Sequence, residues 1–144
     1  MMGAGEAGGW RSWEPSSCSG PLKSGVGARE TPRRTLSVAL VTRNRPASLA
    51  RTLAPLRKQS VQPQEVVIAD DSDDEWAPQV RAIARAYGCR YAVGPKRGLC
   101  PNRNAPALAC RATHIRTIDD DHEFPAGHIE ACIAAIIRDP LSWR

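Results

Sequence analysis

Short apolar runs alternate with amphipathic segments along this chain from residue 36 onward. Residues 36–41 (LSVALV) and 65–69 (EVVIA) have the β-branched, apolar character of buried strands. Residues 90–93 and 114–118 predict two further, weaker strands. After each run, apolar residues recur at every third or fourth position, which predicts a helix. The pattern therefore predicts four strand–helix units in succession.

The predicted helices are marked by apolar stripes and by residues that start or stop helices. Pro46 favours a helix start, Gly88 is a usual helix end, and Asp139-Pro140 closes the last helix. We expect the stripes to lie in the core. They are Leu49, Leu53 and Leu56; Trp76, Val80, Ile83 and Tyr87; Ala105, Leu108, Ala109 and Ala112; and Ile129, Cys132, Ile133 and Ile136.

The alternation of strands and helices predicts an α/β fold, with a mainly parallel sheet and helices on both of its faces. In such sheets, ligands bind at the carboxyl ends of the strands. Polar clusters follow three of the predicted strands, at residues 42–45, 70–74 and 119–123. We therefore expect a ligand site where these three clusters meet.

The first part of the chain has a different composition. Residues 1–27 are rich in Gly and Ser and have no apolar periodicity. We interpret residues 1–34 as a disordered N-terminal extension, or as sequence upstream of the true start, followed by one domain at residues 35–144. The N-terminal residues lack the apolar segment of a signal peptide. No stretch of the chain approaches the roughly 18 apolar residues of a membrane helix.

The five cysteines are odd in number and have no C-x-x-C spacing. This usage favours a reduced, cytoplasmic compartment, with the thiols packed as small apolar residues. For Cys100 we expect a packed side chain rather than a nucleophile.

The net charge of +5 is compatible with an anionic partner. The acids after residue 34 gather in two clusters, at residues 70–75 and 119–123, within otherwise basic sequence. No run of Lys and Arg is interleaved with aromatic residues, so nucleic-acid binding is not expected. The distribution fits an anionic ligand held through a metal ion.

Three adjacent acids, Asp119, Asp120 and Asp121, follow the fourth predicted strand. Crowded carboxylates repel one another unless a positive charge lies among them. Carboxylate oxygens suit Mg²⁺ or Mn²⁺, which are commonly shared with substrate phosphates. The run therefore predicts a nucleotide diphosphate site. The alternative is an acidic turn that caps the helix after Pro125.

The segments VTRNRP, VVIADDS and IDDDHEFP occur in the order and spacing of family 2 glycosyltransferases, whose fold is the GT-A nucleotide-sugar-binding fold. They resemble the family's PTYNRP, VVDDGS and D-x-D motifs. Between them, GLCPNRN is similar to the family's G…ARN stretch. The resemblance covers about residues 36–140.

The resemblance implies roles for individual residues. Asp71 matches the carboxylate that accepts a hydrogen bond from the imide N–H of uracil or thymine. Thr42, Arg43 and Asn44 stand where the family binds the nucleotide. The family often has an aromatic residue at the position of Arg43. A guanidinium plane can also stack on a base, so the base identity stays open.

For the acids, the resemblance implies that Asp119 approaches the ribose and that Asp121, together with Asp119, binds the metal. Asp120 is then the intervening position. Because three acids follow one another, the two acids of D-x-D could also be shifted by one residue. Arg103 matches the Arg of ARN, which faces the diphosphate, and its fork of donors suits phosphate oxygens. His122 is expected to be exposed or hydrogen-bonded rather than a metal ligand.

The implied reaction is inverting transfer of a sugar from a UDP- or TDP-sugar to an unknown acceptor hydroxyl, with Mn²⁺ or Mg²⁺ as cofactor. An Asp or Glu serves as general base in this family. We expect that base beyond Arg144, and so expect a hexosyltransferase-type enzyme truncated after its D-x-D motif. The alternatives are a non-catalytic nucleotide-sugar binder or a sugar-nucleotide nucleotidyltransferase. The latter needs a Gly-rich loop after the first strand, and residues 42–46 contain no Gly.

Overall fold

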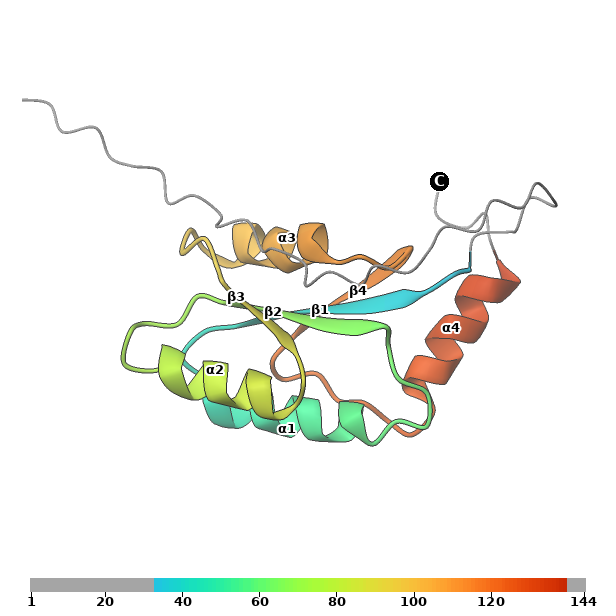
Figure 1. Cartoon of the computed structure of the whole chain (residues 1–144), viewed down its shortest axis with the longest axis horizontal. Helices are drawn as coiled ribbons and strands as arrows, with labels where there is room; N and C mark the ends of the chain where they lie inside the picture. Colours follow the sequence, from blue (N-terminus) through green and yellow to red (C-terminus); the bar gives the residue numbers. More distant parts are fainter. Residues whose placement is uncertain (1–32, 140–144) are drawn as a thin grey trace, which may run out of the picture. The chain divides into compact units, whose positions relative to one another are not determined.

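The computed structural model describes residues 33–139 (Figure 1). Strands and helices alternate strictly along this part of the chain. They are β1 (Leu36–Thr42), α1 (Pro46–Arg57), β2 (Glu65–Asp70), α2 (Ala77–Ala86), β3 (Arg90–Val93), α3 (Leu99–Ala109), β4 (His114–Asp119) and α4 (His128–Arg138). The extension predicted at residues 1–34 lies almost entirely outside the described residues, as does Pro140.

The four strands form one parallel sheet in the order β3-β2-β1-β4. Helices α1 and α2 lie on one face of this sheet and α3 lies on the other (Figure 1). The predicted fold class, a parallel α/β sheet with helices on both faces, is therefore confirmed. Since β1 pairs with both β2 and β4, the carboxyl ends of these three strands lie at the same edge.

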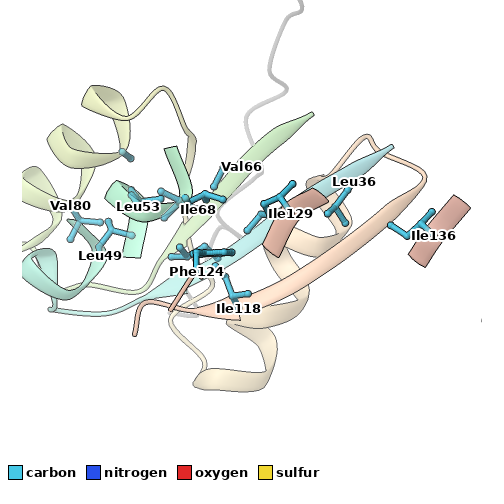
Figure 2. Packing of buried hydrophobic residues seen from close by; sticks show 14 residues of the cluster. Leu36, Leu49, Leu53, Val66, Ile68, Val80, Ile118, Phe124, Ile129 and Ile136 are labelled. Atoms are coloured by element: carbon cyan, nitrogen blue, oxygen red, sulfur yellow. The ribbon is translucent and has the colours of Figure 1, made fainter. Parts of the chain in front are cut away.

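The core fills the space between the sheet and the helices on the face that α1 covers. Apolar side chains from β1, β2, β4, α1, α2 and α4, together with Phe124 from the loop before α4, form a single cluster (Figure 2). All three leucines predicted for the α1 stripe, Leu49, Leu53 and Leu56, are fully buried. Each contributes about 1.5–3 kcal/mol by leaving water, which holds α1 and the loop before it in place.

The core face predicted for helix α3 is only partly correct. Its buried residues are Asn102, Ala105 and Pro106, whereas Leu108 is 87% exposed and Ala112 lies beyond the helix. On a helical wheel, the face centred on Asn102 points to the sheet, and Leu108 lies well over 90° away from it. The packed side chain expected at Cys100 is also wrong, because Cys100 is exposed.

Two further findings bear on the environment of the protein. No helix within residues 33–139 is long and apolar enough to cross a membrane. The cysteines of this region, Cys89, Cys100, Cys110 and Cys132, are all free thiols.

Candidate functional site

The three polar clusters predicted from the sequence meet at the carboxyl edge of the sheet. The register pairs Thr42 with Asp70 and Val41 with Asp119. The backbone N–H of Asp71 donates to the carbonyl of Thr42 at 3.0 Å, which carries the β1–β2 pairing into the loops. The parallel sheet therefore brings together side chains that are far apart in the sequence.

Asn44 joins the loop after β1 to the loop after β2. Its φ of 54° is a left-handed conformation that Asn tolerates better than most residues. Its backbone N–H donates to Ser72 Oγ at 2.8 Å, its Oδ1 accepts from the Asp73 N–H at 2.8 Å, and its Nδ2 donates to Asp73 Oδ2 at 2.6 Å. The side chain of Asn44 is thus engaged in holding the two loops together.

Thr42 and Arg43, both predicted to bind nucleotide, face different environments. Thr42 is 4% exposed, and its hydroxyl donates to Asp120 Oδ2 at 2.8 Å. The side chain of Arg43 is exposed and lies 3.8 Å from Asp73. Of the two side chains, only that of Arg43 is accessible to a ligand.

The two acids at the end of β2 are both buried, but they have different hydrogen-bond partners. Asp70 is 1% exposed and accepts hydrogen bonds from the Ser72 N–H at 2.9 Å and the Tyr91 hydroxyl at 2.8 Å. Burial, together with the carboxylate of Asp70, raises the pKa of Tyr91 to about 12. Asp70 therefore holds β2 and β3 together. Asp71 accepts at Oδ1 from the Lys96 N–H at 2.9 Å.

The acids after β4 alternate in direction. Asp119 and Asp121 have side chains that are 40% and 63% exposed, whereas the side chain of Asp120 is only 4% exposed. Asp120 Oδ1 pairs with Arg45 at 3.0 Å. The pKa of Asp120 is raised above its ordinary value, mainly by burial. The hydrogen bond from Thr42 and the charge of Arg45 act in the opposite direction. Asp120 is therefore a buried anchor between two outward-facing acids.

The backbone of this turn is held as well. The carbonyl of Asp120 accepts from Ser48 Oγ at 2.9 Å and from Thr52 Oγ1 at 2.7 Å, and both donors lie on α1. Because α1 is fixed in the core by its leucines, these hydrogen bonds hold the turn at residues 119–121 in place as well.

Arg103 on α3 binds Asp119 through two hydrogen bonds, from Nε at 3.2 Å and from Nη2 at 2.6 Å. The hydrogen bonds to Asp119, together with its charge, raise the pKa of Arg103. The predicted phosphate-facing Arg and a predicted metal ligand are therefore partners in the same ion pair.

The donor set fits a metal that is shared with a substrate. Within residues 33–139, no group of three or more His, Cys, Asp or Glu side chains could hold a metal ion. Mg²⁺ and Mn²⁺ commonly take one or two protein carboxylates and complete their shells with phosphate oxygens and water. The two exposed carboxylates of Asp119 and Asp121 meet this requirement.

His122 lies in an aromatic cluster rather than among these acids. Its ring lies edge-on to Phe124, at 4.6 Å between centroids, and to His128, at 5.5 Å. Burial, assisted by the charge of Arg116, lowers the pKa of both histidines. Sequence analysis did not identify this cluster, because His128 lies in none of the predicted motifs or apolar stripes.

Sequence analysis also missed Gly94 and Asn102, which adjoin Asp71. A Cβ atom on Gly94 would lie 2.2 Å from Asp71 Oδ1 and 2.3 Å from Asn102 Oδ1. The available signal was a Gly immediately after the third strand, which often marks a close approach of side chains to the backbone.

Comparisons with known proteins complete this description. A comparison with curated proteins finds no match. Among solved structures, Staphylococcus aureus TarS residues 1–349 in complex with UDP-GlcNAc has a TM-score of 0.60 and 19% identity, over 72% of this chain and 31% of that one. The same TarS fragment in complex with UDP has a TM-score of 0.62 and 21% identity, over 72% and 32% of the two chains. A longer TarS structure has a TM-score of 0.60 and 22% identity, over 72% and 20%.

This chain thus spans about a third or less of those structures, and the likeness to them shows a shared fold. The family comparison reaches further, because the sequence pattern of "Glycosyl transferase family 2" matches residues 37–142, most of the chain. The motifs after β1, β2 and β4 all lie within this range. The chain therefore belongs to glycosyl transferase family 2.

Proposed function

We propose that this chain binds a nucleotide-diphospho-sugar, a UDP- or TDP-sugar, through Mg²⁺ or Mn²⁺, as the donor-binding part of an inverting glycosyltransferase. The observation that carries the proposal is the meeting of Asp71, Asp119, Asp121 and Arg103 at one edge of the sheet. The TarS structures with UDP and UDP-GlcNAc support the choice of a nucleotide-sugar donor.

The roles follow from the chemistry of each group. Asp71 accepts the imide N–H of the base, and the exposed Arg43 stacks on its ring. Asp119 and Asp121 would hold the metal, and the metal would neutralise negative charge on the diphosphate. Arg103 presents a planar fork of N–H donors, the geometry that suits phosphate oxygens.

Transfer requires the diphosphate to depart as negative charge builds on it. The bound metal would supply Lewis-acid stabilisation of that charge. The N–H groups of Arg103 that do not bind Asp119 add donors for the diphosphate at the same edge. Transfer also needs a general base that deprotonates the acceptor hydroxyl, and it is a proposal for the whole protein.

Calorimetric titration of the 144-residue chain with UDP, with and without Mn²⁺, tests the donor-binding role. We expect binding that depends on Mn²⁺ and weakens at least tenfold in Asp121→Ala, about 1.4 kcal/mol. Glu130→Ala removes an exposed carboxylate on α4 and serves as the control. Metal-independent binding that Asp121→Ala leaves unchanged would contradict the assignment.

A further inference from the structure

Two side chains converge on the backbone of Gly94, the residue that follows β3. The N–H of Gly94 donates to the carbonyl of Asp70 at 2.8 Å, which holds this backbone at the sheet edge. The position of a Cβ on Gly94 would be 2.2 Å from Asp71 Oδ1 and 2.3 Å from Asn102 Oδ1. The carboxylate and the amide therefore occupy the same small space above Gly94.

Asn102 lies in the first turn of α3 and is 3% exposed. Its Oδ1 is buried and has no hydrogen-bond partner among residues 33–139. Ala stands at this place in the ARN stretch that the segment resembles, so a buried amide is a departure in this chain. A buried polar group without a partner is unfavourable, and it calls for a specific explanation.

The two oxygens of Asp71 are in different situations. Oδ1 accepts from the Lys96 N–H at 2.9 Å and lies, like Asn102 Oδ1, beside the Cβ position of Gly94. Oδ2 accepts no hydrogen bond from the part of the chain that the structure describes. One oxygen is therefore held by the protein, and the other remains for a ligand.

The amide of Asn102 also carries an NH₂ group, which can donate to Asp71 Oδ1. A half-turn about its terminal torsion exchanges the carbonyl oxygen with the NH₂ group and leaves the shape of the side chain almost unchanged. An N–H of Asn102 would then take the place of its oxygen beside Asp71 Oδ1. A second donor there would hold the carboxylate in one orientation and leave Oδ2 for a ligand.

We propose that Asn102 is a positioning residue that fixes Asp71 for base recognition and thereby makes the site selective for a base with an imide N–H. The inference rests on the proposed nucleotide binding. Uracil and thymine present that N–H to a carboxylate. Cytosine presents a lone pair at the same ring position, which a fixed carboxylate repels.

The experiment compares the affinities of UDP and CDP for the full chain in the presence of Mn²⁺. The two ligands carry the same diphosphate, so contributions from the metal and Arg103 cancel in their ratio. We expect the wild-type chain to bind UDP at least tenfold more tightly than CDP. In Asn102→Ala, UDP affinity falls about tenfold, the effect of one hydrogen bond to a charged group, and the ratio moves toward one.

Asn104→Ala is the matched control, because Asn104 is exposed on the same helix. Asn102→Asp is a second variant that keeps the shape of the side chain but cannot donate to Asp71. Melting temperatures of all variants separate loss of fold from loss of recognition. A variant that loses stability but keeps the UDP-to-CDP ratio shows a purely structural residue, and overturns the inference.

Other outcomes distinguish this inference from the proposal on which it rests. Equal Mn²⁺-dependent binding of UDP and CDP by the wild-type chain overturns base selectivity but leaves donor binding intact. Binding of neither nucleotide overturns both. A ratio that falls in both Asn102 variants and stays unchanged in Asn104→Ala supports the positioning role.

Discussion

Removing the buried acid between Asp119 and Asp121, by Asp120→Ala, is expected to destabilise the fold. The substitution removes the acceptor of the Thr42 hydroxyl, a hydrogen bond to a charged group worth about 1.5–3 kcal/mol. It also removes the pair with Arg45, whose side chain is 52% exposed, so that solvent screening limits this contribution to less than about 1 kcal/mol. The expected loss of unfolding free energy is about 2–3 kcal/mol.

Thermal unfolding followed by circular dichroism measures this loss. For a domain of this size, the expected change corresponds to a melting temperature lower by about 10 °C. Asp121→Ala is the matched control, because that side chain is 63% exposed and surface substitutions usually change stability by about 0.5 kcal/mol or less. The two variants should therefore separate, with Asp120→Ala losing stability and Asp121→Ala losing Mn²⁺-dependent nucleotide binding. An unshifted melting temperature in Asp120→Ala would refute the anchor role.

Three further predictions concern the neighbourhood of the site. Gly94→Ala should abolish UDP binding, since its methyl group overlaps Asp71 Oδ1; unchanged titration calorimetry would contradict this. Because the folded-state pKa values of His122 and His128 lie below the ordinary value of about 6.5, their contribution to stability is complete above pH 6.5 and declines as the pH falls. Between pH 7.5 and 5.5, the melting temperature should fall less in a variant with both His122→Gln and His128→Gln than in the wild-type chain. Arg103→Gln should weaken UDP binding about tenfold but strengthen Mn²⁺ binding without nucleotide, because it frees a carboxylate; calorimetry with Mn²⁺ alone checks the sign.

The sequence was sufficient to predict the fold wherever burial follows the period of the element. In α1, Leu49, Leu53 and Leu56 recur on one stripe, and all three are buried. In α3 the same reasoning failed at Leu108, because the face that packs on the sheet carries a polar residue, Asn102. An apolar stripe predicts the buried face only where apolar residues provide the contact, and near this site a buried amide replaces them.

The sequence predicted where the site lies better than it predicted what each side chain does. Asp71, Asp119 and Arg103 do lie at the carboxyl edge of the sheet, because parallel register fixes which strand ends meet. Thr42 and Asn44 come from the same motifs, but their side chains bind other parts of the protein. A motif records which residues occur together, and it does not separate groups that hold the loops from groups that are free for a ligand.

The open register of the three acids has a physical solution in the strand that precedes them. Side chains alternate between the two faces of a strand, and Ile118 lies on the core face. Asp120, in the turn directly after β4, is buried like Ile118, whereas the side chains of Asp119 and Asp121 are exposed. The contacts of Asp120 with Thr42 and Arg45 fit this burial, since both partners belong to the segment that joins β1 to α1. If the proposed metal binds here, we expect Asp119 and Asp121 to share it, because a shift by one residue would require the buried carboxylate of Asp120 to leave its hydroxyl and guanidinium partners.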